Sequence, residues 1–538
     1  MAQLDWVILI AYIAGIVIMA SLIGRRQKNQ EDYYLGGRKM PPWQVALSVM
    51  ATQVSAISLI GAPAFIALKS GGGLIWLQYE FAVPLAMILI LIILVPTYHR
   101  MKSITIYEYL ERRFGTRTRY LISLIFLLSR GLGTGVALLA TGIVTSACMG
   151  IPLAPTIILI GVVSMLYTTI GGIKADIYSD IIQLVVLWGA TIVCISIAWN
   201  LLGDSALVFD EIQKSRLIAI DFKSHGLGDG KTFAFWPMII GGLFLYFSYY
   251  GCDQSESQRI LTTSGPDDAK KALFVNGLLR FTLVLTYCFF GVLLLSFIGK
   301  NPEFGAKLAD VQPDFLVPYF LLDYIPTGLL GIVIAGIFAA SMSSIDSAMN
   351  ALSAATWRDF LMKLFPRMAD YPAERTVRIS RILTVVWGGI ATVFALYLMG
   401  GADTVIVLVN KIGSAFYGPV LGVFLLGILS QKPNQTGAVA GLLAGVGLNM
   451  ILWQGFQDTV SWLWWNPIGF FTCFTTGYAV SILTSVGDRS VDDADPVTRI
   501  HGTISIKGKT KTYVIVLLLA FVAMIAITIA IQKWLTSS

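Results

Sequence analysis

The chain has 538 residues, of which 56% are hydrophobic and 13% are charged, and its mean hydropathy is +0.75. A water-soluble domain carries about 25% charged residues, so this composition excludes a soluble enzyme and predicts a polytopic membrane protein. The formal net charge of +7 would suit a nucleic-acid partner in a soluble protein. In a membrane protein, basic residues first report topology.

Fourteen apolar segments follow one another along the chain, each long enough to cross a bilayer as a helix of about 20 residues. Strands of an outer-membrane barrel would be about 10 residues long and would alternate in polarity. We therefore expect an all-α protein with about 14 transmembrane helices. The segments are 4–24, 44–67, 74–96, 120–149, 153–172, 177–201, 235–254, 274–298, 326–352, 380–400, 404–430, 436–455, 462–484 and 513–532.

The basic residues indicate the orientation of these spans. Most of the 38 Lys and Arg residues fall in connections on the side of the first loop, 25–43. Basic loops stay in the cytoplasm, so we expect this loop to be cytoplasmic. An even number of spans then places both termini on the extracellular or periplasmic side.

Two segments contain polar interruptions. Residues 51–58 read Ala-Thr-Gln-Val-Ser-Ala-Ile-Ser, and Gly61 and Pro63 follow; residues 246–254 read Tyr-Phe-Ser-Tyr-Tyr-Gly-Cys-Asp-Gln. A broken helix exposes backbone carbonyls that can bind a small cation, although small polar residues can also serve only for helix packing. Interruptions at corresponding places in two halves predict an inverted-repeat transporter with its site near the midplane.

The ninth segment carries a stripe of small residues on one helix face, formed by Ala340, Ser343, Ser344 and Ser347. Such a stripe often serves only for packing. The carboxylate of Asp346 beside it needs a partner, and a bound cation is one. Oxygen donors without Cys or His suit an alkali or alkaline-earth ion.

Five further charged residues lie in or at the ends of segments. We expect Glu80, Arg130 and Lys411 to belong to a site or an internal ion pair, because each is several residues inside its segment. Arg280 is near a segment start and is expected at the membrane interface. For Asp180, also near a segment start, solvation at the cytoplasmic face is the alternative to a site.

Several passages resemble the sodium/solute symporter family, which includes sodium-coupled transporters for glucose, proline, sialic acid and monocarboxylates. The most specific passage runs from Pro326 to Leu352, and others are Asp32 to Arg38, Gly171 to Gln183 and Asp253 to Arg259. The resemblance continues in order from about residue 4 to 485.

This resemblance implies a LeuT-like fold with a five-plus-five inverted repeat. Residues 1–43 would form a leading helix and cytoplasmic loop, 44–201 the first repeat, 202–234 an extracellular loop, 235–430 the second repeat, and 431–538 the trailing helices.

The resemblance also implies two sodium sites. The main site would consist of the carbonyls of Ala51, Val54 and Ala340 and the hydroxyls of Ser343 and Ser344. A second site, present in some members, would consist of Asp180, Ser343, Asp346 and Ser347. Asp346 departs from the hydroxyl usual there, which leaves the sodium stoichiometry open.

The solute pocket of similar proteins is lined by the second, third, seventh and eleventh segments, and by the fourth in some. Two cations and one carboxylate on these faces favour an anionic solute, such as a sialate-like sugar acid or another carboxylated solute. A neutral sugar or an amino acid is the alternative. The candidate solute-binding residues are Gln53, Ser58, Tyr79, Glu80, Arg130, Tyr246, Tyr249, Tyr250 and Lys411.

We therefore expect a sodium-coupled symporter that imports a small organic solute by alternating access. It would work as a monomer in the plasma membrane, with sodium as co-transported ligand, no cofactor and no nucleic-acid partner. An ion channel or another non-coupled membrane protein is the alternative class. An enzyme is not expected, because the spans contain no His and no HExxH or GxSxG motif.

Overall fold

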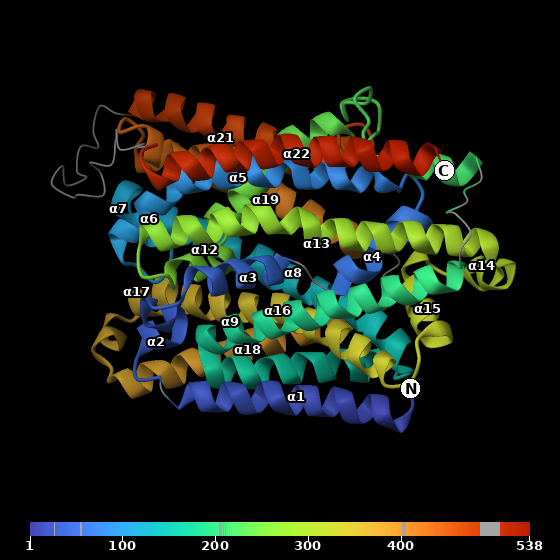
Figure 1. The fold of residues 1–538 in the computed structure, drawn as a ribbon. Helices are drawn as coiled ribbons and strands as arrows, with labels where there is room; N and C mark the ends of the chain where they lie inside the picture. The colour runs from blue at the N-terminus through green and yellow to red at the C-terminus, as the bar shows by residue number, and fades with distance from the viewer. Residues whose placement is uncertain are drawn as a thin grey trace.

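The computed structural model describes residues 1–25, 27–53, 56–203, 207, 209, 211–400, 405–484 and 506–537. Every regular element in these ranges is a helix, as Figure 1 shows. The helices are α1 (Gln3–Gly24), α2 (Gln30–Leu35), α3 (Pro42–Gln53), α4 (Ala56–Ala67), α5 (Ala82–Leu89), α6 (Val95–Met101), α7 (Glu108–Phe114), α8 (Thr116–Met149), α9 (Leu153–Leu202), α10 (Glu211–Arg216), α11 (Gly242–Cys252), α12 (Gln254–Leu261), α13 (Pro266–Lys300), α14 (Pro302–Leu308), α15 (Leu316–Tyr324), α16 (Leu329–Ala355), α17 (Met362–Leu364), α18 (Ala373–Tyr397), α19 (Val405–Leu429), α20 (Gln435–Phe456), α21 (Trp462–Thr484) and α22 (Lys509–Ser537). Shorter or irregular helical pieces are Gly36–Arg38, Leu74–Phe81, Ile90–Leu94, Pro237–Gly241, Pro313–Phe315, Thr356–Leu361, Pro366–Asp370 and Leu398–Gly400.

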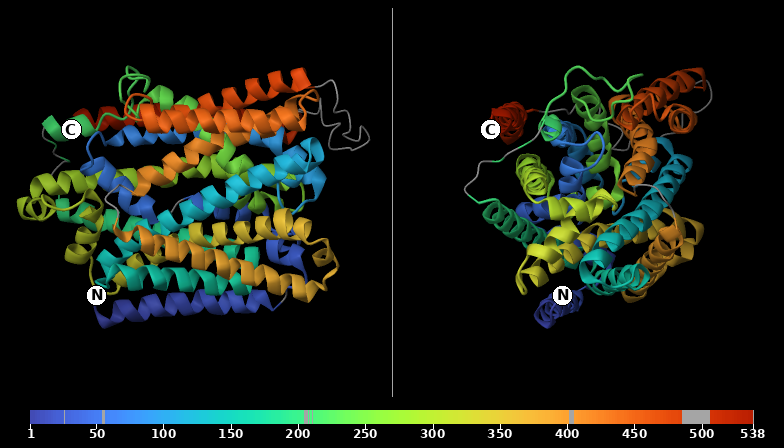
Figure 2. Two further views of the ribbon diagram at one scale, coloured as in Figure 1. Left: turned by 180° about the vertical axis from the view of Figure 1, so that it is seen from behind. Right: turned by 90° about the vertical axis from the view of Figure 1, so that its right-hand side faces the viewer.

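The long helices lie side by side in an elongated bundle (Figures 1 and 2). Both termini lie at one end, and α2, α7 and α17 lie at the other. Within the described ranges, eleven helices are long and apolar enough to cross a membrane, or twelve if α3 and α4 form one bent span. The expected all-α membrane class is confirmed, whereas the number of fourteen spans stays a prediction.

Helix α9 covers two of the predicted segments, 153–172 and 177–201. A straight helix of 50 residues would be about 75 Å long, more than twice the thickness of the hydrocarbon core. Gly172 kinks it with φ 56° and ψ −165°. Glycine adopts such a conformation readily, and a Cβ here would lie 2.6 Å from the carbonyl oxygen of Tyr33.

The two predicted interruptions are both real breaks. The helical stretches Pro42–Gln53 of α3 and Ser58–Ala67 of α4 are bent by 52° relative to each other. Helix α11 ends at Cys252, and Asp253 is extended with φ −87° and ψ 127° before α12 begins. The Asp253 side chain accepts a hydrogen bond from the Ser255 backbone N–H at 2.8 Å, which caps the N-terminus of α12.

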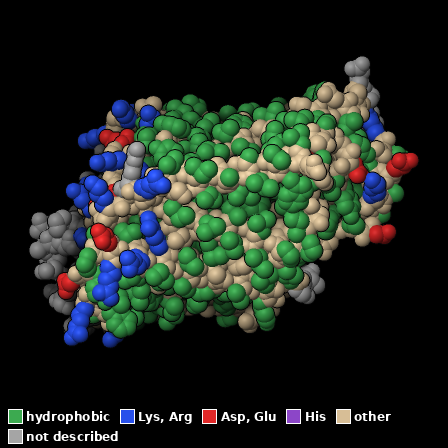
Figure 3. Space-filling model, turned by 90° about the horizontal axis from the view of Figure 1, so that it is seen from below, with side chains coloured by type: hydrophobic (Ala, Val, Ile, Leu, Met, Phe, Trp, Pro, Cys, Tyr) green, Lys and Arg blue, Asp and Glu red, His purple; other side chains and the backbone are tan. Residues whose placement is uncertain are grey.

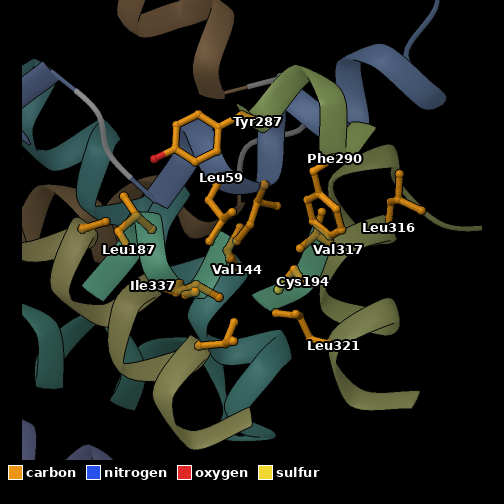
Figure 4. Close-up of a cluster of buried hydrophobic side chains, with 14 of the residues drawn as sticks. Leu59, Val144, Leu187, Cys194, Tyr287, Phe290, Leu316, Val317, Leu321 and Ile337 are labelled. Carbon is orange, nitrogen blue, oxygen red and sulfur yellow. The ribbon is translucent and has the colours of Figure 1, made fainter. Parts of the chain in front are cut away.

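Helix α16 lies in the centre of the bundle, and α1 and α22 lie at its surface. In the most apolar stretch of α16, 83% of the residues are buried. The corresponding share is 22% in α1 and 17% in α22. The end-on view in Figure 2 shows α1 and α22 on the outside. Figure 4 shows one buried apolar cluster, in which Leu59 of α4 and Ile337 of α16 face side chains of α8, α9, α13 and α15. This packing holds both α4 and α16 in place.

The surface of the bundle divides into an apolar middle and two polar ends. On the face seen in Figure 3, hydrophobic side chains cover the middle, and Lys and Arg are concentrated at one end, which carries α2, α7 and α17 in Figure 1. We call this the basic end. An apolar middle is the surface that a hydrocarbon core would solvate.

Candidate functional site

The end of α3, just before its break, lies against the middle of α16. Ser343 Oγ is 3.2 Å from the carbonyl oxygens of both Ala51 and Ala340, so its hydroxyl can donate to either. Ser344 Oγ donates to the carbonyl oxygen of Thr52 at 2.8 Å. Oxygen atoms from two helices therefore converge between α3 and α16.

These oxygens have the chemistry of ligands for a small hard cation. Of the five residues predicted for the main sodium site, Ala51, Ala340 and Ser343 lie together. Ser344 bonds the carbonyl next to Ala51, and Val54 lies outside the described residues. A cation here would replace the hydroxyl hydrogens as the partner of the carbonyls.

Arg259 of α12 connects three other helices in a second polar cluster. Its Nη2 lies 2.9 Å from Asp180 Oδ2 and also donates to Ser347 Oγ, and its Nε donates to Ser48 Oγ at 2.8 Å. Ser48 donates to Asp180 Oδ2 at 2.5 Å. All four side chains belong to residues that are at most 1% exposed. The alternative of a solvated Asp180 is therefore wrong, because its carboxylate is buried and paired.

Asp346 lies close to this cluster on α16. Its carboxylate accepts hydrogen bonds from the Tyr167 hydroxyl and from the Ser347 backbone N–H. The structure thus brings the predicted second-site residues into one region but places the Arg259 guanidinium between Asp180 and Ser347. Sequence reasoning missed this role, although Arg259 closes one of the passages that carry the family resemblance.

Aromatic and amide side chains gather beside the two breaks. The Tyr250 hydroxyl donates to Gln53 Oε1, which links α11 to the end of α3. The rings of Tyr79 and Tyr246 lie 4.9 Å apart, and those of Tyr249 and Tyr250 lie 5.2 Å apart. Five of the nine predicted solute residues therefore line adjoining surfaces.

Glu80 forms a buried ion pair with Arg280 of α13. Arg280 Nε and Nη2 lie 2.6 and 3.2 Å from the two carboxylate oxygens, and the Tyr246 hydroxyl lies 3.4 Å from one of them. The expected position of Arg280 at the membrane interface is wrong, because Arg280 is 5% exposed and its side chain is paired with Glu80. An arginine several residues inside a span needs a partner, so the sequence could have indicated that Arg280 is paired, although not with which residue.

Arg130 of α8 is less fully paired. Its nearest carboxylate oxygen is Asp253 Oδ2 at 3.9 Å, and its guanidinium lies 5.8 Å from the centre of the Tyr249 ring. The buried Nε has no hydrogen-bond partner among the described residues. This guanidinium can therefore accept an anionic partner.

The two remaining predicted solute residues lie apart from these contacts. Lys411 Nζ donates to Gln457 Oε1 at 3.0 Å, and this contact is exposed. Gln457 is the residue that follows α20. Ser58 lies on α4 after the break and is half-buried.

A helical bundle with two broken spans, beside which buried oxygen atoms and a buried guanidinium gather, is typical of a secondary transporter. The sodium:solute symporter family model matches residues 33–445, so the chain belongs to this family. It is a sodium-coupled transporter and not an enzyme.

Relatives of known activity match most of the chain. The sodium/sialic acid symporter NanT of Aliivibrio fischeri is 29% identical over 479 residues, which cover 88% of this chain and 92% of that protein. Sodium-coupled monocarboxylate transporter 2 of Bos taurus is 30% identical over 441 residues, covering 81% of this chain and 69% of that protein.

Solved structures confirm the LeuT-like fold. A substrate-bound, outward-open structure of a Na⁺-coupled sialic acid symporter, described as revealing a novel Na⁺ site, matches with a TM-score of 0.79 at 24% identity and covers 90% of this chain and 98% of that chain. Mhp1, a nucleobase-cation-symport-1 family transporter in a closed conformation, matches with a TM-score of 0.52 at 13% identity. This match covers 89% of this chain and 97% of the Mhp1 chain.

Proposed function

We propose that this protein imports a small carboxylated solute, such as a sugar acid, together with sodium. The observation that carries the anionic solute is the buried guanidinium of Arg130, with an unpartnered Nε and its nearest carboxylate at 3.9 Å. A guanidinium is planar and presents donors that match a carboxylate. The sialic acid and monocarboxylate transporters among the relatives agree with this chemistry.

In this proposal the solute lies between the two broken helices, with its carboxylate on Arg130. The rings of Tyr79, Tyr246 and Tyr249 would cover its apolar faces, and Gln53 and Tyr250 would supply hydrogen bonds. Glu80 would act through Arg280 and Tyr246, because its own charge is already neutralised. Ser58 and Lys411 would lie at the edge of the solute pathway.

Gln53 offers a physical connection between sodium and solute. It lies two residues after Ala51, which would bind sodium through its carbonyl oxygen, and it accepts a hydrogen bond from Tyr250. A sodium ion held by Ala51, Val54, Ala340, Ser343 and Ser344 would fix the end of α3 and thereby the solute-binding position of Gln53. Such coupling is reciprocal and typically amounts to about 1–3 kcal/mol.

A second sodium ion would bind near Asp180, Asp346 and Ser347. Asp180 Oδ1 has no hydrogen-bond partner among the described residues and could contact the ion. Arg259 would then release Ser347 while keeping its ion pair with Asp180.

We further propose that the basic end faces the cytoplasm and that both termini lie outside. The concentration of Lys and Arg there (Figure 3) supports this orientation through the positive-inside rule. The protein would then work as a monomer in the plasma membrane and move solute inward along the sodium gradient, by alternating exposure of the site.

The solute class can be tested by thermal stability of the full-length protein in detergent. Sialic acid, a monocarboxylate, a neutral sugar and an amino acid would each be added in sodium or in potassium. We expect a carboxylated solute to raise the melting temperature more in sodium, because ligands that bind only the folded state stabilise it.

Arg130→Gln should abolish that stabilisation, while Arg117→Gln, a change of an exposed arginine on the same helix, should preserve it. Sodium-dependent stabilisation by the neutral sugar or the amino acid, unchanged in Arg130→Gln, would contradict the anionic solute.

A further inference from the structure

One buried carboxylate has no role in the sodium and solute sites described above. Asp176 of α9 is 0% exposed, and neither of its carboxylate oxygens has a hydrogen-bond partner among the described residues. Burying a charge without partners is expensive. Ionisable groups inside a membrane span are accordingly rare and usually functional.

One polar side chain lies beside Asp176. The hydroxyl of Thr168, a residue that is 0% exposed, faces and interacts with this carboxylate, although the two groups do not reach hydrogen-bond geometry. Asp176, Asp180 and Gln183 are spaced four and three residues apart, so they share one face of α9.

The charges in this region do not balance. Asp176, Asp180 and Asp346 all interact with a single cation, Arg259, which also faces Glu256. Arg259 bonds Asp180 directly at 2.9 Å. A second sodium near Asp180 and Asp346 would cancel one further charge and would still leave Asp176 uncompensated.

The remaining titratable neighbours of Asp176 carry no positive charge. They are the phenols of Tyr33 on α2 and of Tyr167 on α9. Tyr33 bonds Thr384, and Tyr167 bonds Asp346, so neither phenol donates to Asp176.

We propose that Asp176 binds one exchangeable monovalent cation, either Na⁺ or H⁺, in addition to the sodium at the main site. The Thr168 hydroxyl would add a further hard oxygen atom beside the carboxylate, and such oxygens suit these cations. The inference rests on the proposed function in one respect, namely that this cation would be co-transported with the sodium ion of the main site. Binding itself requires no solute.

The test is equilibrium binding of ²²Na⁺ to the full-length protein in detergent without any solute, combined with infrared spectroscopy of protonated carboxyl groups across a pH series. If the cation is Na⁺, the wild type binds one more sodium ion per chain than Asp176→Asn. If it is H⁺, the sodium counts are equal, and the wild type shows a carboxyl band that vanishes at high pH and that Asp176→Asn lacks.

Asp5→Asn is the matched control, because Asp5 is also buried but accepts three backbone hydrogen bonds. It should keep both the sodium count and the band. Equal sodium counts together with no titrating band assigned to Asp176 would overturn the proposal.

If Asp176→Asn does not fold, the double variant Ser343→Ala, Ser344→Ala gives the answer. The proposal is supported if this double variant still binds sodium or still shows a titrating carboxyl band. The sodium affinity or the position of the band should then change when Asp176→Glu is added. Loss of all cation binding in the double variant overturns it. Because no solute is present, failure of the anionic-solute proposal would not affect either readout.

Discussion

Glu80 and Arg280 show how single residues hold charge inside the bundle. The two lie 200 positions apart in the chain, and both are buried where they meet. Two charges in a low-dielectric interior offset their lost hydration only when the geometry of the pair is good. Here the guanidinium contacts both carboxylate oxygens, with Nε and Nη2 at 2.6 and 3.2 Å.

Breaking this pair from one side should be costly. We expect Glu80→Gln or Arg280→Gln to lower the free energy of unfolding by about 3–5 kcal/mol, since each leaves one buried charge alone. The double variant should lose much less than the sum of the two. Chemical unfolding of the four proteins in detergent measures this.

The exposed pair of Lys307 and Asp323, at 2.7 Å, supplies the control. Lys307→Gln should leave the stability nearly unchanged, because solvent screens an exposed pair. If the effects of Glu80→Gln and Arg280→Gln simply add, the pair does not act as a unit.

Residues differ in how far the sequence predicts their partners. The contacts of Ser343 with Ala51 and Ala340 were predictable from the helical spacing of the small residues together with the family resemblance. The partner of Arg280 was not, because ion pairing depends on which helices pack together, and the order of residues in the chain does not reveal that. The unpartnered state of Asp176 escaped prediction for the same reason.

At the scale of elements, the breaks at α3–α4 and α11–α12 bring the two candidate sites together. The sequence indicates both breaks through polar residues beside Gly and Pro or before an Asp. The segments 153–172 and 177–201 meet at the kink of Gly172. The sequence does not reveal that this connection is a single kinked residue, because four residues between two apolar segments look like a short loop.

Asp253 has two tasks at the second break, which can be separated. It caps α12 through the Ser255 N–H and faces Arg130 at 3.9 Å. Asn also caps helices, so Asp253→Asn should keep the melting temperature, whereas Asp253→Ala should cost about 1 kcal/mol of stability.

Both variants of Asp253 should bind the carboxylated solute more tightly, because Arg130 loses the nearer of the two carboxylates that interact with it, the other being Glu256. Thermal unfolding and solute titration of the same preparations check the two effects. Equal destabilisation by Asn and Ala would show that the charge of Asp253, and not its cap, supports α12.

At the scale of the whole molecule, the central position of α16 explains why its small residues matter. It is the most buried of the candidate spans, and its hydroxyls meet the carbonyl oxygens at the end of α3. A cation bound there would tie the first half of the core to the second. A loss of this connection should uncouple solute movement from the sodium gradient.

The most direct test of this account is sodium-driven uptake into proteoliposomes by the double variant Ser343→Ala, Ser344→Ala. The solute would be radiolabelled sialic acid, or whichever carboxylated solute stabilises the protein best. Ser341→Ala is the control, because Ser341 is buried in the same helix but donates to the Ile337 carbonyl oxygen of that helix. We expect the double variant to insert normally and to lose sodium-dependent uptake, while Ser341→Ala transports as the wild type does. Undiminished sodium-driven uptake by the double variant would contradict a sodium site between α3 and α16.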